Sequence, residues 1–241
     1  MRKFHGFLAG AIAAGCLLVA GGPANATPFF FNVTGGCSEA CAANAVITPG
    51  AGTLTVVLND TEADPRSAGD VLSSIEITPS GTLGTPTLTT QAGSLIDVTP
   101  GASAGTPIAG SPTHWGVGTA SGQLVLETAG TFAVGGPPIN MIIGPAPYTN
   151  SNSSIGNFNP YIDGTGTFTI ADSAITADTT ITAVSFDFGT GPDTTLPGSV
   201  CTPGTPNCGT SGPPLVPEPS ALALVGSALA MFGFVWRRRS V

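Results

Sequence analysis

Alternating apolar and polar residues dominate the middle of the chain. Leu54, Val56 and Leu58 alternate with Thr and Val, and Phe168 and Ile170 alternate with Thr167 and Thr169. Similar period-two patterns include Val71/Ile75/Ile77, Leu124/Leu126 and Val184/Phe186/Phe188. Such patterns, separated by clusters of Gly, Pro, Asn and Asp, are typical of half-buried antiparallel strands. We expect about eight to ten strands in a mostly β body over residues 27–190, arranged as an antiparallel β-sandwich of the jelly-roll or Ig-like Greek-key type.

The N-terminus has the three parts of a secretory signal peptide. Arg2 and Lys3 precede an apolar stretch over residues 7–20, and Ala24 and Ala26 supply small residues at −3 and −1 of a cleavage site. We therefore expect residues 1–26 to form a signal helix that signal peptidase removes after Ala26. Lipoprotein processing at Cys16 is the alternative, although apolar residues continue beyond that cysteine.

The C-terminus combines a short motif, an apolar run and a basic cluster. The motif is Val216-Pro217-Glu218-Pro219, the apolar run covers residues 221–236, and Arg237, Arg238 and Arg239 follow. As a helix, residues 220–236 would measure roughly 25 Å, near the short end for a transmembrane helix. The arginines predict a cytoplasmic tail and a body on the opposite side of the membrane.

These C-terminal features resemble the PEP-CTERM sorting signal of Gram-negative bacteria that make exopolysaccharide. The resemblance covers residues 216–241. It implies that an exosortase-type transpeptidase recognises Pro217, Glu218 and Pro219 and cleaves nearby, with Arg237, Arg238 and Arg239 as the stop-transfer cluster. It further implies transient anchoring, followed by release to the cell surface or extracellular matrix. A plain membrane anchor behind a Pro-rich linker is the alternative.

Residues 191–215 are rich in Pro, Gly and Thr and have few large apolar side chains. This composition predicts a stalk, partly in the polyproline II conformation, between the body and the sorting signal.

The distribution of charge excludes some classes of function. Charged residues make up 8% of the chain, and residues 27–217 hold 13 acidic residues but only one basic residue, Arg66. A nucleic-acid-binding protein needs a basic patch, so this class is excluded. A net charge of about −12 indicates a soluble, self-repelling surface.

Four cysteines remain after signal-peptide removal. Their even number in an exported chain favours disulfides, and sequence proximity favours Cys37–Cys41 and Cys201–Cys208 among the three possible pairings. A zinc site lacks histidine partners and the usual spacing, so we predict no metal site there.

Candidate chemistry in the body is sparse, and we assign no catalytic residue. His114 and Trp115 are adjacent, and Trp115 is a candidate for ligand contact, with Tyr148 and Tyr161 as further sugar-stacking aromatics. A hydrolase would need paired carboxylates, for which the candidates are Glu39, Glu62, Glu76 and Glu127. A structural calcium ion could take oxygen ligands from Asp60, Glu62 and Asp64, or from Asp187 and Asp193. We expect instead that these residues form acidic turns exposed to solvent. Arg66 is expected to pair with Asp60, Glu62 or Asp64.

The sequence thus favours a non-enzymatic exported protein of the cell envelope or exopolysaccharide matrix, without a cofactor. Its expected partners are signal peptidase, an exosortase-type transpeptidase and, in the matrix, extracellular polysaccharide. A carbohydrate-binding module and a secreted hydrolase are the alternative functions.

Overall fold

Strand β3 (Thr53–Asp60) shows how the alternating sequence becomes a half-buried strand. In the computed structural model, which describes residues 26–191 and 193–209, every second residue of β3 is buried. Leu54, Val56 and Leu58 are fully buried in the core, whereas Thr55 and Val57 lie on the opposite side and are partly exposed. Successive side chains of a strand point to opposite faces, so the pattern places one face of this sheet inward.

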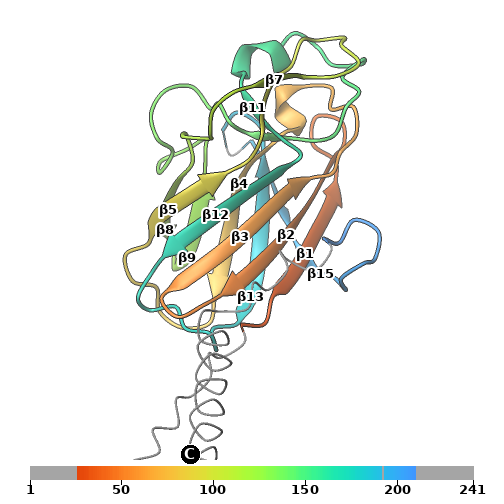
Figure 1. Ribbon diagram of the computed structural model, residues 1–241. Helices are drawn as coiled ribbons and strands as arrows, with labels where there is room; N and C mark the ends of the chain where they lie inside the picture. Colours follow the sequence, from red (N-terminus) through yellow and green to blue (C-terminus); the bar gives the residue numbers. More distant parts are fainter. Residues whose placement is uncertain (1–25, 192, 210–241) are drawn as a thin grey trace, which may run out of the picture. The chain divides into compact units, whose positions relative to one another are not determined.

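One sheet has six strands, all paired antiparallel, in the order β15-β1-β2-β3-β12-β5. Its other strands are β15 (Ser199–Val200), β1 (Phe29–Gly35), β2 (Cys41–Pro49), β12 (Thr165–Ala171) and β5 (Thr87–Ala92). In Figure 1 this sheet lies in front of the other one.

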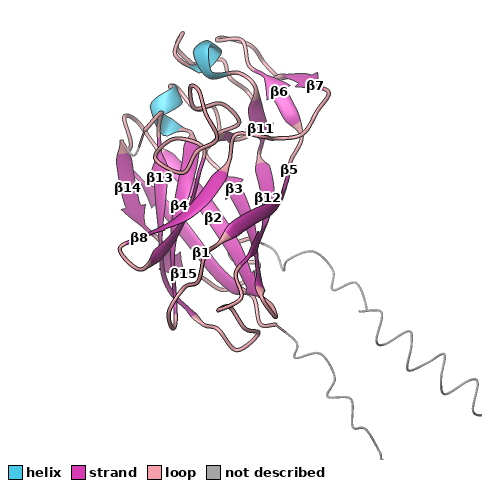
Figure 2. Cartoon of the chain, turned by 90° about the vertical axis from the view of Figure 1, so that its left-hand side faces the viewer, coloured by secondary structure: helices cyan, strands magenta, loops and turns pink. Residues whose placement is uncertain are grey.

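The second sheet has nine strands, with β14-β13-β4-β10-β11-β6-β7 as its main path and the β8–β9 hairpin paired to β4. Its strands are β4 (Leu72–Pro79), β6 (Leu95–Asp97), β7 (Thr106–Ile108), β8 (Gly116–Ala120), β9 (Gln123–Glu127), β10 (Ile142–Ile143), β11 (Tyr161–Asp163), β13 (Ile181–Phe188) and β14 (Thr194–Pro197). The β10–β11 pair is parallel, which departs from the expected all-antiparallel pairing. Two short 3₁₀ helices, η1 (Ala68–Asp70) and η2 (Ile155–Phe158), lie at the same end of the body as β6, β7 and β11 (Figure 2).

The main hydrophobic core receives side chains from both sheets. Leu58 of the six-stranded sheet and Ile75 and Phe186 of the nine-stranded sheet belong to the same buried cluster. A smaller cluster near η2 includes Tyr148, Ile155 and Tyr161. The prediction of a mostly β chain is confirmed.

Fifteen strands occur in the described residues, more than the eight to ten expected. The additional ones are short, such as β10 with two residues and β6 and β7 with three each. A strand of two or three residues is too short to display a period-two pattern, so the sequence did not reveal it.

The structure also moves the boundary between body and stalk. Residues 194–197 pair with β13, residues 199–200 pair with β1, and the described body extends to Gly209. Residues 194–197 and 199–200 of the segment expected to be a stalk are therefore strands of the two sheets. The predicted signal helix and transmembrane helix lie outside the described residues. Within residues 26–191 and 193–209, no helix is long and apolar enough to cross a membrane.

Candidate functional site

The residues assigned to sorting fall almost entirely outside the described part of the chain. This holds for the motif Pro217-Glu218-Pro219, for the arginine cluster 237–239 and for Ala24 of the cleavage site. Ala26 is the first described residue and is partly buried. What the structure adds is the geometry of the body from which the C-terminal segment continues.

That segment continues from a disulfide loop fixed to the six-stranded sheet. We call residues 199–209 the clasp. Its strand β15 pairs with β1, and the amide of Cys201 donates to the carbonyl oxygen of Phe30 at 3.0 Å. Cys201 and Cys208 form a disulfide, and Cys208 packs against Phe30 and Val46. A Cβ added to Gly209 would lie 2.9 Å from the Val46 side chain, so the clasp contacts the sheet closely up to its last described residue.

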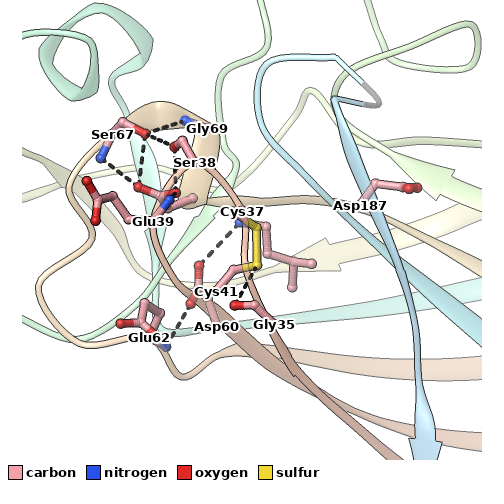
Figure 3. Close-up of a disulfide and its surroundings, with 12 residues drawn as sticks. Gly35, Cys37, Ser38, Glu39, Cys41, Asp60, Glu62, Ser67, Gly69 and Asp187 are labelled. Atoms are coloured by element: carbon pink, nitrogen blue, oxygen red, sulfur yellow. Dashed lines mark hydrogen bonds between the residues drawn. A yellow bond between two sulfur atoms is a disulfide. The ribbon is translucent and has the colours of Figure 1, made fainter.

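The second predicted disulfide, Cys37–Cys41, is also present (Figure 3). Asp70 fixes its loop through hydrogen bonds. The Asp70 side chain is fully buried and accepts from the Ser38 hydroxyl at 2.8 Å and the Glu39 amide at 3.2 Å. Its other oxygen accepts from the amide and hydroxyl of Ser67, which forms a capping box at η1. Sequence reasoning missed Asp70, although the Ser67-x-x-Asp70 spacing is a capping-box signal.

Beside this loop is a polar surface hollow of about 350 Å³. Glu39, Glu62, Asp64, Arg66 and Asn150 are among the residues that line it. Arg66 pairs with Glu39 at 3.5 Å, so the expected pairing with Asp60, Glu62 or Asp64 is wrong. Both side chains are more than half exposed, at 57% and 55%, and an exposed pair of this kind contributes at most about 1 kcal/mol.

The carboxyl groups of Asp60, Glu62 and Asp64 do not form a common ligand set. Asp60 is buried and accepts from the amides of Glu62 at 3.0 Å and Leu72 at 3.2 Å. Burial raises the pKa of Asp60 well above its ordinary value, and burial also raises the pKa of Glu62. Asp64 accepts hydrogen bonds from Asn150, which lower the pKa of Asp64. Asp64 therefore contacts the 149–150 segment and not the other two carboxyl groups. Within the described part of the chain, no three His, Cys, Asp or Glu side chains converge to hold a metal ion.

The aromatic residues predicted to contact a ligand are inside the protein. Trp115 is fully buried, donates from Nε1 to the carbonyl oxygen of Asn140 at 2.7 Å and lies 4.6 Å from Phe168 between ring centroids. Tyr148 and Tyr161 are also buried, and burial raises the pKa of Tyr148 to about 12. Contrary to the expected ligand contact, Trp115 thus has no exposed surface, its indole nitrogen is hydrogen-bonded within the protein and its ring lies beside Phe168.

The four candidate glutamates separate into two pairs. Glu39 and Glu62 line the hollow, whereas Glu76 and Glu127 lie on the neighbouring strands β4 and β9. On the outward side of the nine-stranded sheet, Glu76, Glu127 and Asp187 form what we call the acidic cluster. Partial burial, together with the charges of Asp187 and Glu127, raises the pKa of Glu76.

Glu127 has a structural role in this cluster. Its Oε1 accepts from the amide of Phe132, which ties the following loop back to β9. Partial burial raises the pKa of Glu127 despite this hydrogen bond. A Cβ at Gly130 would collide with the Glu127 carboxyl group, so the loop lies directly against it.

Asp187 and His114 also contact neighbouring protein groups. Asp187 accepts from the Thr195 hydroxyl of β14. His114 accepts from the Val134 amide through its carbonyl oxygen, and its Nδ1 lies 3.2 Å from the Thr113 hydroxyl. The carboxylates of Glu127 and Asp187 thus join neighbouring parts of the nine-stranded sheet.

Comparison with known families assigns the C-terminal segment that follows the body. The family model described as the PEP-CTERM protein-sorting motif matches residues 215–239. The chain carries a PEP-CTERM sorting motif. This match includes all residues of the predicted motif and the arginine cluster, and no other domain is recognised. Neither a comparison with curated proteins nor one with solved structures yields a match. The PEP-CTERM motif implies an exported protein that is transiently anchored in the membrane and processed by an exosortase-type enzyme.

Proposed function

We propose that this protein is a non-enzymatic component of the cell envelope or exopolysaccharide matrix, delivered there through its PEP-CTERM motif. The match at residues 215–239 carries this proposal. In it, signal peptidase cleaves after Ala26, and an exosortase-type transpeptidase cleaves near Pro217-Glu218-Pro219 and separates the body from the arginine tail. The released body then resides at the cell surface or in the matrix of a Gram-negative bacterium.

The properties of the body support a structural rather than a catalytic role. Two disulfides suit an oxidising location outside the cytoplasm. Among the candidate groups, Trp115, Asp60 and Glu127 are buried and hydrogen-bonded to the protein's own backbone. We further propose that the body is a β-sandwich, which the core shared by the two sheets supports.

The clasp limits how far the body lies from the cleavage point. Pro217 follows Gly209 by eight residues, and a fully extended chain covers at most about 3.6 Å per residue, or about 29 Å in all. The sorting enzyme would therefore act close to the folded body.

The intact mass of the protein from the host's surface and medium tests this function. We expect a form that lacks residues 1–26 and everything beyond about Glu218. A triple variant, Pro217→Ala, Glu218→Ala and Pro219→Ala, should retain Trp236 and the arginines and stay in the membrane fraction. The control, Pro213→Ala with Pro214→Ala, changes two prolines outside the motif and should be processed normally. A wild-type protein that keeps its arginine tail would show a plain membrane anchor and refute the proposal.

A further inference from the structure

The outward side of the six-stranded sheet carries regular rows of uncharged polar side chains. The strand register places Thr90 of β5, Thr169 of β12, Thr55 of β3 and Thr48 of β2 side by side in one row. Neighbouring strands lie about 4.8 Å apart, so the four hydroxyl groups recur at about this spacing. Thr90 is exposed, and the other three are partly exposed.

A second row crosses the same strands further along. Here the register aligns Thr165 of β12, Asn59 of β3 and Asn44 of β2. Asn59 donates to Asn44 at 2.6 Å, and Thr165 donates to Asn59 at 2.5 Å. Asn44 is buried beside Gly209 of the clasp, so Asn59 and Thr165 are the members of this row that reach the surface. We call the two rows together the Thr/Asn face. It looks toward the viewer in Figure 1, where β5, β12, β3 and β2 lie side by side.

The strands that form this face carry no exposed charged side chain. Across all six strands of the sheet, Asp60 is the one charged residue, and its side chain is buried. The acidic cluster of Glu76, Glu127 and Asp187 lies instead on the outward side of the nine-stranded sheet. The body thus has one uncharged hydroxyl- and amide-bearing side, although residues 27–217 carry 13 acidic groups and one arginine.

Resting on the proposed matrix role, we propose that the Thr/Asn face binds neutral polysaccharide chains. Hydroxyl and amide groups both donate and accept hydrogen bonds, which matches a polymer whose own polar groups are hydroxyls. A second copy of the body or an acidic polymer would bring like charges together, whereas a neutral chain would not. Regular rows suit an extended polymer, because several ordinary hydrogen bonds can form at once along its length.

An isosteric pair of substitutions tests this face. In Thr55→Val/Thr169→Val, the hydroxyls of two adjacent positions are lost while shape and β propensity are kept. The matched control, Thr119→Val/Thr182→Val, changes two exposed threonines on strands of the nine-stranded sheet. Full-length protein in mild detergent would be passed over immobilised neutral β-glucan, dextran and mannan, and over acidic alginate. A charged pair, Thr90→Glu/Thr165→Glu, at exposed positions of the same face provides a second, independent variant.

We expect the wild type and the control to bind at least one neutral glycan in preference to alginate. The Thr55/Thr169 variant should bind it about tenfold more weakly, as the loss of two ordinary hydrogen bonds predicts. Equal binding by the wild type and both face variants would overturn the assignment of this face. Absence of binding to every neutral glycan, or a preference for alginate, would overturn the ligand class. In either case the mass measurement on the sorted protein would be unaffected, so failure of this inference is distinguishable from failure of the proposed function.

Discussion

Replacement of each disulfide by two serines tests whether burial or loop length governs the contribution of these crosslinks to stability. Cys201 and Cys208 are seven residues apart, whereas Cys37 and Cys41 are four apart. The entropy of loop closure alone predicts a loss of about 2.5 kcal/mol for Cys201→Ser/Cys208→Ser and about 2 kcal/mol for Cys37→Ser/Cys41→Ser. On loop length alone, the clasp variant should therefore lose more stability.

The surroundings of the two bonds reverse this order. Cys41 is 1% exposed and belongs to the main core, so a serine hydroxyl there must be buried at a further cost of about 1–3 kcal/mol. Cys208 is 7% exposed and belongs to the small cluster with Phe30 and Val46 at the surface of the sheet. If the clasp opens locally, the loss for its variant is limited to the stability of the clasp itself. We expect about 2 kcal/mol for this variant and about 3–5 kcal/mol for Cys37→Ser/Cys41→Ser.

Thermal unfolding followed by circular dichroism measures both variants against the wild type. For a body of this size, about 2 kcal/mol corresponds to a decrease in Tm of roughly 4–8 °C. Hydrogen exchange should also show faster exchange of the residue-201 amide, which bonds to Phe30, in the clasp variant. A clasp variant that loses as much stability as the Cys37/Cys41 variant would refute the reasoning from burial.

Three further substitutions have defined outcomes. Because the pKa of Glu76 is raised in the folded protein, this carboxyl group holds its proton more tightly there than in the unfolded chain. The protonated group therefore stabilises the folded protein below about pH 4, and this stabilisation is lost as the pH rises. Glu76→Gln should therefore stabilise the protein slightly at pH 7 and flatten the decline in stability between pH 4 and 7, measured by urea unfolding; an unchanged pH profile would contradict this. Trp115→Phe should cost about 1–3 kcal/mol through the unpaired Asn140 carbonyl but leave glycan binding unchanged, and a selective loss of binding would contradict the core assignment. Asp70→Ala should cost about 3 kcal/mol or more, because it removes the acceptor of four hydrogen bonds, and limited proteolysis should then cleave first near the Cys37–Cys41 loop.

The long strands and both disulfides could be predicted because their signals are local. In β3 and β12, alternation over seven or eight residues specifies which side chains are inside, and the structure follows it. The cysteines of each pair are close in the chain, so proximity identified the partners. The sorting signal could also be predicted, because its motif, apolar run and basic cluster follow one another in a single continuous segment.

The environment of Trp115 and the extent of the body could not be predicted, because both depend on distant partners. Nothing near Trp115 in the sequence identifies Asn140, 25 residues later, as the acceptor of its indole hydrogen. Strand β14 ends in Pro197 and lies at an edge of the nine-stranded sheet, where proline is tolerated because one side of the strand needs no partner. Its proline and threonine residues are also typical of a stalk, so composition alone did not identify it as a strand.

The position of the clasp on the six-stranded sheet relates sorting to the proposed binding face. The clasp covers Phe30 and Val46 of β1 and β2, and the rows of threonine and asparagine continue beside it over β3, β12 and β5. The C-terminal segment therefore continues from the same side of the body that we propose to contact polysaccharide. In the unprocessed protein, at most about 29 Å of extended chain joins the end of the clasp to the motif. Cleavage near Glu218 would free the body from this short connection, so polysaccharide binding should be stronger for the released form than for the membrane-anchored motif variant.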